Sequence, residues 1–399
     1  MSGLVYSWFV DGFPNFNPKA TRSEEAEYPD ALSQGPVRGR GAQLNPGNRF
    51  ESVRLHVLGE HLDAEFHERE SEHGQGSGQR GLQLKTTPLD DDTRTIINPV
   101  DSPDISFKWT VNPYRGCEHG CIYCYARPGH EYLGLSSGLD FETKIFAKPR
   151  APELLRKALR HPKWTGEAIV VSGVTDPYQP IERDREITRE CLKVMAEFRQ
   201  PVGLITKNKL ITRDLDILRE MSSWQGVHAA VSLTSLDNDL AHKMEPRASS
   251  PKARLEAIEQ LASAGIPVRV MTAPILPGLN DREVPALLKA AADAGARGAG
   301  YVMLRLPYQI KDLFLDWLKR EFPQRAAHVE SLVRQMHSGE LYSSAWFSRQ
   351  RGSGPFAQQV GQTFKVFAKR YKLDGDFPKL NTSAFRKDVP EGGQMQLFG

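Results

Sequence analysis

Three cysteines lie within eight residues, in the stretch GCEHGCIYC at positions 116–124. Iron-sulfur clusters take thiolate ligands, and closely spaced cysteines on a glycine-containing loop can wrap three corners of a cubane. Three protein ligands leave one iron open, and an open coordination position lets a metal site bind a substrate or cofactor directly. The C-x3-C-x2-C spacing therefore predicts a catalytic [4Fe-4S] cluster bound by Cys117, Cys121 and Cys124.

A structural zinc site is the alternative, with His119 or His130 completing a Cys3His ligand set. The position of the cysteines directly after the first strand of a βα repeat favours the cluster. The fourth cysteine, Cys191, shares an apolar helical stripe with Ile187 and Val194, which indicates a buried core thiol. Cysteines used in this way are typical of a reducing compartment.

The elements that must position the cysteines are repeated. From about residue 105, short β-rich apolar runs alternate with amphipathic helical patterns, which is typical of βα units with a parallel sheet. We expect strands at 106–111, 168–172, 202–206, 227–233, 268–273 and 300–304. We expect helices at 151–159, 182–198, 213–221, 251–264, 282–294 and 310–322. These units predict a partial (β/α)6 TIM-type barrel, whose loops after the strands gather at one rim.

Less regular segments flank this core. Residues 1–95 are rich in Gly, Ser, Pro, Glu and Arg, which predicts a largely disordered, low-complexity extension. Its stretch RGRG at 38–41 reads as a flexible linker, with nucleic-acid contact as the alternative. We place the catalytic core at 100–325, a helical C-terminal extension at 326–390 and a flexible tail at 391–399. An apolar stripe from Phe356 to Tyr371 is predicted to pack against the barrel.

The cysteine motif, its position after the first strand and the six βα units together resemble the radical S-adenosylmethionine (SAM) superfamily. Three motifs, NPYRGC at 112–117, TDPYQP at 175–180 and EPR at 245–247, resemble its spore photoproduct lyase-related branch, also labelled DNA repair photolyase-like. The resemblance runs from about residue 100 to 305. It implies a reduced [4Fe-4S] cluster that chelates SAM and cleaves it to a 5′-deoxyadenosyl radical, which abstracts hydrogen from a substrate. It also implies an electron donor such as flavodoxin or ferredoxin.

The resemblance also assigns roles to single residues. Tyr123 would pack beside the cluster near the adenine, and Lys207 matches a lysine that meets the methionyl carboxylate. Ser232 matches a polar residue that faces the ribose or carboxylate. Three residues occupy the segment that contacts the cofactor amino group: Ser172, Thr175 and Asp176.

Two residues, and a thiol that the sequence lacks, bear on the identity of the substrate. Tyr125 matches a catalytic tyrosine that follows the cluster in the branch, and Arg247 would pair with a phosphate or carboxylate, or lie solvated on the surface. Spore photoproduct lyases carry a hydrogen-donating cysteine near the end of the second strand. Residues 171–175 read VSGVT and contain no thiol. Repair of spore photoproduct itself is therefore not expected.

Partners are indicated only weakly by composition. The net charge of +3 permits nucleic acid without demanding it. The final stretch Gln394–Phe398 resembles the peptide by which repair proteins dock on the bacterial sliding clamp, which favours a DNA substrate. The alternatives are a radical SAM enzyme acting on a small molecule or protein, and a non-catalytic zinc or Fe-S adaptor on the clamp. No apolar run approaches the roughly 20 residues of a membrane span, and no signal peptide is recognisable, so we expect a cytoplasmic protein.

Overall fold

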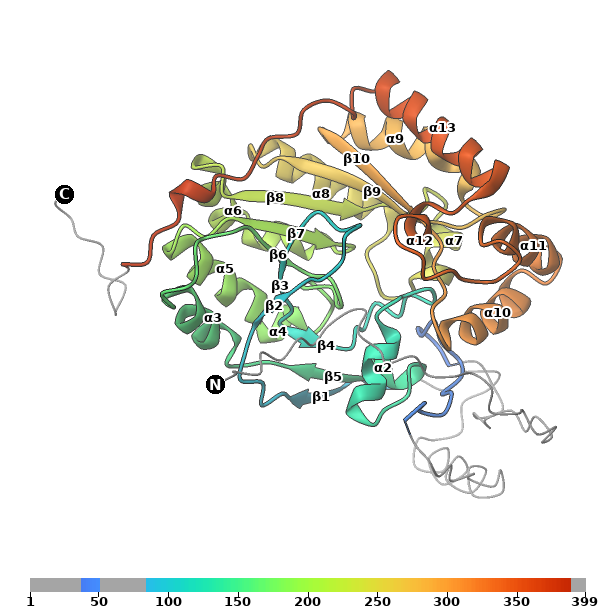
Figure 1. Cartoon of the computed structure of the whole chain (residues 1–399), viewed down its shortest axis with the longest axis horizontal. Coiled ribbons are helices and arrows are strands. Elements are labelled where there is room, and N and C mark those ends of the chain that lie inside the picture. The colour runs from blue at the N-terminus through green and yellow to red at the C-terminus, as the bar shows by residue number, and fades with distance from the viewer. Residues whose placement is uncertain (1–36, 51–83, 389–399) are drawn as a thin grey trace, which may run out of the picture.

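The computed structural model describes residues 37–50 and 84–388. Its main sheet has seven strands in the order β10-β9-β8-β7-β6-β3-β2 (Figure 1). The strands are β2 (Ile97–Pro99), β3 (Trp109–Val111), β6 (Ile169–Val171), β7 (Val202–Thr206), β8 (Val227–Ser232), β9 (Val268–Ile275) and β10 (Gly298–Met303). Each strand from β3 through β6, β7, β8 and β9 to β10 is parallel to its neighbour in this order, and β2 adds an antiparallel edge. This sheet of six βα strands confirms the predicted partial barrel.

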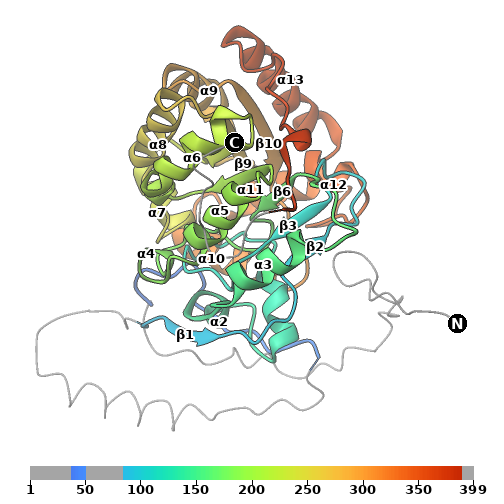
Figure 2. The same cartoon turned by 90° about the vertical axis from the view of Figure 1, so that its left-hand side faces the viewer.

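The outer face of the sheet is covered by helices in both views (Figures 1 and 2). They are α3 (Ala151–Leu159), α4 (Glu182–Arg185), α5 (Ile187–Glu197), α6 (Leu215–Ser223), α8 (Pro251–Ser263) and α9 (Val284–Asp293), with short 3-10 turns η2 (Lys209–Asp214) and η3 (Asp281–Glu283). The predicted helix after β10, α10 (Ile310–Glu321), lies away from this face, beyond the carboxyl ends of the strands (Figure 1). Helix α8 begins where the sequence predicts, because the Ser250 hydroxyl accepts a hydrogen bond from the Ala253 N–H and Pro251 occupies the first turn.

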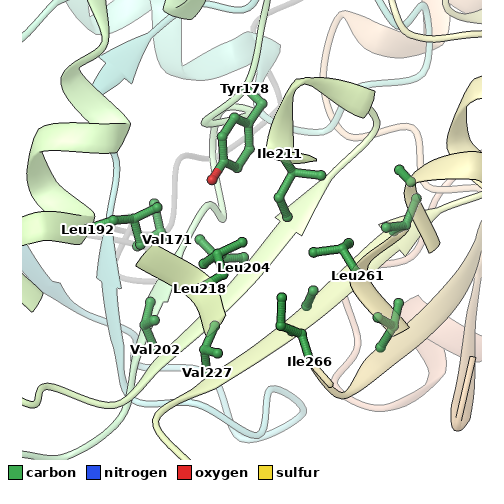
Figure 3. Close-up of a cluster of buried hydrophobic side chains, with 14 of the residues drawn as sticks. Val171, Tyr178, Leu192, Val202, Leu204, Ile211, Leu218, Val227, Leu261 and Ile266 are labelled. Carbon is green, nitrogen blue, oxygen red and sulfur yellow. The ribbon is translucent and has the colours of Figure 1, made fainter. Parts of the chain in front are cut away.

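The main core lies between the sheet and these helices. Figure 3 shows Val171, Leu204 and Val227 from three neighbouring strands gathered with Leu192 of α5 and Leu218 of α6. All five side chains are at most 1% exposed. Burial of such side chains contributes about 1.5–3 kcal/mol each. Cys191 is fully buried in the same core, as the sequence predicts.

The predicted helix at 182–198 is interrupted. Glu186 adopts a left-handed conformation, with φ 53°, and separates α4 from α5. The buried Glu182 carboxylate folds back and accepts a hydrogen bond from the Thr188 N–H at 3.0 Å, so it satisfies a donor at the start of α5. The amphipathic pattern continues through both α4 and α5, so the sequence alone predicts one helix.

Several short elements were not predicted. A second sheet has the order β1-β5-β4 and consists of β1 (Thr87–Asp90), β4 (Tyr114–Arg115) and β5 (Lys144–Ala147). Beside it lie η1 (Arg127–Leu133) and α2 (Leu139–Thr143), and α7 (Asn238–Met244) lies within the segment expected as a loop after β8. Elements of two to seven residues are too short to show periodicity, so long-range contacts decide them.

Residues 37–50 pack against the core. The buried Arg40 guanidinium donates hydrogen bonds to the carbonyls of Glu142 at 2.6 Å and Leu84 at 2.8 Å. The Gly41 N–H donates to the Glu142 carboxylate at 3.0 Å. The interpretation of Arg38–Gly41 as a flexible linker is therefore wrong. The disorder prediction is also wrong at residues 84–95, which contain β1 paired with β5. Residues 1–36 and 51–83, on which most of that prediction falls, lie outside the described residues.

The C-terminal extension is helical as far as Arg370, with α11 (Ala326–Met336), α12 (Ser348–Arg351) and α13 (Gly354–Arg370). The predicted stripe is confirmed, since Phe364 of α13 packs on Tyr301 of β10 with ring centroids 4.6 Å apart. The chain then crosses the amino ends of the strands, with one short turn, η4 (Thr382–Ala384) (Figure 1). We call residues 373–388 the strap. The domain boundaries at 100, 325 and 390 stay predictions.

In the part of the chain that the structure describes, no helix combines the length and apolar character that a bilayer crossing requires.

Candidate active site

The three cysteines lie on one loop, residues 117–124, which we call the cysteine loop. Cys117 and Cys121 are buried and Cys124 is partly buried. The turn between the first two requires glycine at position 120, where φ is 65° and a Cβ would lie 2.6 Å from the Glu142 carboxylate. Backbone bonds from Gly120 to Cys117 and from Cys124 to Cys121 close the turns. The loop is therefore folded by its own backbone.

The loops after the barrel strands hold the cysteine loop in place. The Glu118 N–H donates to the Gln179 side chain at 2.8 Å in the loop after β6. The Ile122 N–H donates to the Met244 carbonyl at 3.1 Å in the segment after β8. The cysteines thus lie at the carboxyl ends of the parallel strands, where this architecture gathers its active sites.

A buried ion pair supports the cysteine loop from the other side. The Arg127 guanidinium donates to the Cys121 carbonyl at 3.0 Å and contacts the Glu142 carboxylate at 2.5 Å. Both side chains are fully buried. The same carboxylate accepts the Gly41 and Ala42 N–H groups. Glu142 therefore joins the N-terminal segment to the loop, and such outer contacts orient metal ligands.

Asp176 organises the loops around the site. Its carboxylate accepts hydrogen bonds from the Lys207 N–H and the Thr206 hydroxyl, both at 2.7 Å, and lies 3.4 Å from His119 Nδ1. Burial alone would raise the pKa of Asp176, but His119 and these donors hold the pKa below its usual value. The carboxylate thus stays ionised with protein donors around it.

Lys207 lies above Tyr123, with its Nζ 5.9 Å from the ring centroid. The Tyr123 hydroxyl donates to the buried Glu245 carboxylate, which also pairs with Arg254. Burial would lower the pKa of Lys207, yet the neighbouring Cys121 and Glu245 raise the pKa above its usual value. Within residues 37–50 and 84–388, no side chain hydrogen-bonds or ion-pairs with Nζ. A charged ammonium beside the cysteines, with no direct ion pair in this described part of the chain, fits a carboxylate-bearing cofactor.

A strained turn follows β6 at the barrel mouth. Ser172 has φ 147°, a conformation that L-residues rarely adopt, and its hydroxyl donates to the Thr175 carbonyl at 3.2 Å. The Tyr125 hydroxyl donates to the Gly173 carbonyl, and Tyr125 is half exposed.

The remaining predicted site residues have protein partners or are enclosed. Ser232 is buried at the end of β8, and its carbonyl accepts a hydrogen bond from Arg254 at 3.1 Å. Arg247 ion-pairs with Glu118 at 3.2 Å while its side chain stays 33% exposed, so both readings of Arg247 stay predictions. The Thr175 hydroxyl donates to the Tyr114 carbonyl. Their roles toward a cofactor stay predictions.

The zinc alternative receives no support from the two histidines. His130 Nε2 contacts the Lys144 carbonyl at 3.0 Å, and His119 faces Asp176. In the described part of the chain, no three His, Cys, Asp or Glu side chains are grouped so as to hold one metal ion. The thiolates of a cubane bind different irons and lie farther apart than the ligands of a single ion.

Sequence reasoning missed the charged residues behind the site, namely Arg127, Glu142, Glu245 and Arg254. Only Glu245 carried a signal, because it opens the motif EPR. The ion pair of Arg127 with Glu142 has no sequence signature, since neither residue belongs to a motif that assigns it a role. Such pairs become visible only when the buried partners are seen together.

A known protein family and several known proteins are similar to this chain. The sequence pattern of the radical SAM superfamily matches residues 111–291. An uncharacterized protein of Mycobacterium tuberculosis is 36% identical over 245 residues, which cover 61% of this chain and 72% of that protein. The chain belongs to the radical SAM superfamily. The cofactors of this superfamily are a [4Fe-4S] cluster and SAM.

Two further proteins are similar to this superfamily member, one in sequence and one in fold. A radical SAM Nalpha-GlyT isomerase of Pseudomonas phage M6 is 24% identical over 233 residues, which cover 57% of this chain and 46% of that protein. Spore photoproduct lyase complexed with dinucleoside spore photoproduct has a similar fold, with a TM-score of 0.50 and 17% identity over 78% of this chain and 92% of that one.

Proposed function

We propose that this radical SAM enzyme binds its cluster through Cys117, Cys121 and Cys124 and abstracts hydrogen from a nucleic-acid lesion or modification. The observation that carries the proposal is the Lys207 ammonium beside these cysteines, at the carboxyl ends of the strands, with no hydrogen-bond or ion-pair partner for its Nζ among the described residues. When bound, the two cofactors supply reductive cleavage of SAM and hydrogen abstraction.

The side chains of this protein bind SAM and orient it. Lys207 pairs with the methionyl carboxylate, and Tyr123, held by Glu245, forms a wall beside the adenine. Ser232 hydrogen-bonds the ribose or carboxylate. Three residues contact the cofactor amino group, namely Ser172, Thr175 and Asp176. Arg247 pairs with a phosphate or carboxylate. Tyr125 is half exposed next to Cys124, which supports a role in giving hydrogen to a substrate.

The nucleic-acid substrate is supported by the relatives. Spore photoproduct lyase, a protein of similar fold, forms a complex with dinucleoside spore photoproduct. The turn after β6 holds Ser172 and Gly173 and no thiol within residues 171–175. A substrate other than spore photoproduct is therefore expected.

The test is anaerobic reconstitution followed by reduction in the presence of SAM, with 5′-deoxyadenosine as the product measured. Wild type should form it, and Cys117→Ala, Cys121→Ala and Cys124→Ala should not. The matched control is Cys191→Ala, a buried thiol in the core, which should retain formation. Bound zinc in place of iron and sulfide, with no 5′-deoxyadenosine, would instead support the adaptor alternative. The substrate is tested by comparing 5′-deoxyadenosine formation with damaged or modified oligonucleotides, small molecules and peptides.

The proposed clamp-binding peptide, Gln394–Phe398, lies outside the described residues. Its test is a pull-down with purified sliding clamp, using wild type and a Leu397→Ala/Phe398→Ala variant. Retention of the wild type alone supports docking, and equal retention or none rejects it.

A further inference from the structure

Three exposed aromatic side chains gather beside the barrel mouth. Phe50, Tyr132 and Tyr308 are 55%, 47% and 47% exposed. They come from segments far apart in the sequence: the N-terminal segment 37–50, η1 and the loop after β10. Grouped exposed aromatic rings are uncommon on a protein surface and mark a site of interaction.

Arg49 stands at the centre of this group. Its guanidinium carbon lies 4.0 Å from the Tyr308 ring centroid and 5.2 Å from that of Phe50, whose ring is 5.0 Å from Tyr132. The buried Glu131 carboxylate holds Arg49 at 2.7 Å. We call Phe50, Tyr132, Tyr308 and Arg49 the aromatic–arginine patch. The patch is preorganised, because the buried Glu131 carboxylate holds the Arg49 guanidinium against the rings of Phe50 and Tyr308.

A second arginine connects the patch to the cysteine loop. Arg305 follows β10, three residues before Tyr308, and its guanidinium carbon lies 5.5 Å from the ring centroid of Tyr125, next to Cys124. In the segments that the structure describes, Arg305 Nε and Arg49 Nη2 have no hydrogen-bond partner. Cationic and aromatic groups therefore form one path from the mouth to the patch.

We propose that the patch binds the nucleotides next to the reacting base as an unpaired strand, by stacking. This inference rests on the proposed nucleic-acid substrate and names its form. Every base has a face that stacks on aromatic rings and guanidinium planes, and arginines suit the phosphates between bases. A base must also leave the helical stack to reach an atom beside the buried cysteine loop. The strand that emerges from the mouth then meets the patch.

The test is fluorescence anisotropy with the reconstituted holoenzyme and a labelled single-stranded oligonucleotide, compared with the same sequence as a duplex. Tyr132→Ala/Tyr308→Ala should weaken single-strand binding about tenfold or more. Tyr132→Phe/Tyr308→Phe keeps the rings and should bind like wild type. Phe347→Ala removes an exposed ring outside the patch and is the matched control. Melting temperature and 5′-deoxyadenosine formation verify that each variant is folded, and the single Tyr132→Ala variant serves if the double variant is not.

Each possible outcome either supports or overturns the proposed role of the patch. Tighter binding of the single strand than of the duplex, lost in the alanine variant alone, supports the patch. Unchanged binding by the alanine variant overturns the patch and leaves the nucleic-acid substrate in place. A wild type that makes 5′-deoxyadenosine but binds no oligonucleotide overturns both the nucleic-acid substrate and the patch. Binding of wild type that prefers the duplex overturns the unpaired strand.

Discussion

Lys207 is the residue whose charge the proposed function assigns to cofactor binding. Its ammonium is flanked by Cys121 and Glu245, which raise its pKa, and it lacks an ion-pair partner within the described ranges. Lys207→Met keeps the length of the side chain and removes the charge. We expect SAM affinity to fall about 10- to 100-fold, because hydrogen bonds to charged groups contribute about 1.5–3 kcal/mol. Equilibrium dialysis of SAM against reconstituted protein measures the change.

A neighbouring lysine is the control for this variant. Lys209 belongs to the same loop and pairs with Glu256 at the surface at 2.5 Å. Lys209→Met should leave SAM affinity unchanged. Equal losses in the two variants would show that the general charge of the loop, and not the position of Lys207, governs binding.

Among the elements, α2 joins the cysteine loop to the N-terminal segment through Glu142. Glu142→Gln preserves the shape but leaves the buried Arg127 charge without its partner. Removal of one partner of a buried ion pair typically destabilises a protein by about 3–5 kcal/mol. We expect a comparable loss in the free energy of unfolding, measured in urea, and lower iron content after purification.

The exposed pair of Arg150 and Glu153 on α3 is the control for Glu142. Its side chains are more than 60% exposed, and exposed pairs contribute little. Glu153→Gln should leave unfolding and iron content unchanged. If Glu142→Gln is as mild as Glu153→Gln, the ion pair with Arg127 does not support the cysteine loop.

A second element contact should respond to acid. Asp104, in the loop before β3, pairs with the buried Arg349 of α12 at 2.6 Å. The Arg349 hydrogen bond lowers the pKa of Asp104 from 3.8 to about 2. Because the folded pKa lies below the usual one, this contact stabilises the fold above pH 3.8 and is lost as the pH falls toward 2.

The corresponding prediction compares melting temperatures at pH 7 and pH 3. Asp104→Asn should lower the melting temperature at pH 7 and should lose less on acidification than wild type, by about 2 °C. Asp376→Asn, at an exposed position, is the control and should behave like wild type. An acid response of Asp104→Asn equal to that of wild type would contradict the assigned pKa.

At the scale of the whole molecule, the strap spans the sheet from β10 to the residues before β6. Its Leu373 carbonyl accepts from Ala299 in β10, and its Arg386 N–H donates to Phe198 after α5. The Phe385 ring occupies the space where a side chain at position 166 would lie. These contacts are at the amino ends of the strands, away from the cysteine loop (Figure 1).

The strap should therefore stabilise the barrel without affecting cofactor binding. We expect Phe385→Ala, which truncates a partly buried ring, to lower the free energy of unfolding by about 1–2 kcal/mol. The SAM affinity of the folded protein should not change. Phe347→Ala, at a side chain that is 64% exposed, is the matched control. A loss of SAM affinity in Phe385→Ala would show that the two ends of the barrel are coupled.

Much of the architecture was predictable from the order of residues. The alternation of apolar runs and amphipathic stretches is repeated six times, so β7 (Val202–Thr206) and α3 (Ala151–Leu159) have the predicted bounds. Periodicity is a local property, and a repeated local property determines a layered fold. The break at Glu186 was not predictable, because it depends on the side chain of Glu182 reaching a neighbouring turn.

The sequence by itself determined the chemistry, since the spacing of Cys117, Cys121 and Cys124 places three thiols on one turn wherever that turn lies. Tertiary structure alone decided what surrounds them. Arg127 and Glu142 form a buried ion pair, and Arg40 and Gly41 hydrogen-bond to Glu142 from about a hundred residues away in the chain. The physical reason is that ligand spacing is a local constraint, whereas the pairing of buried charges depends on which distant segments exclude water together.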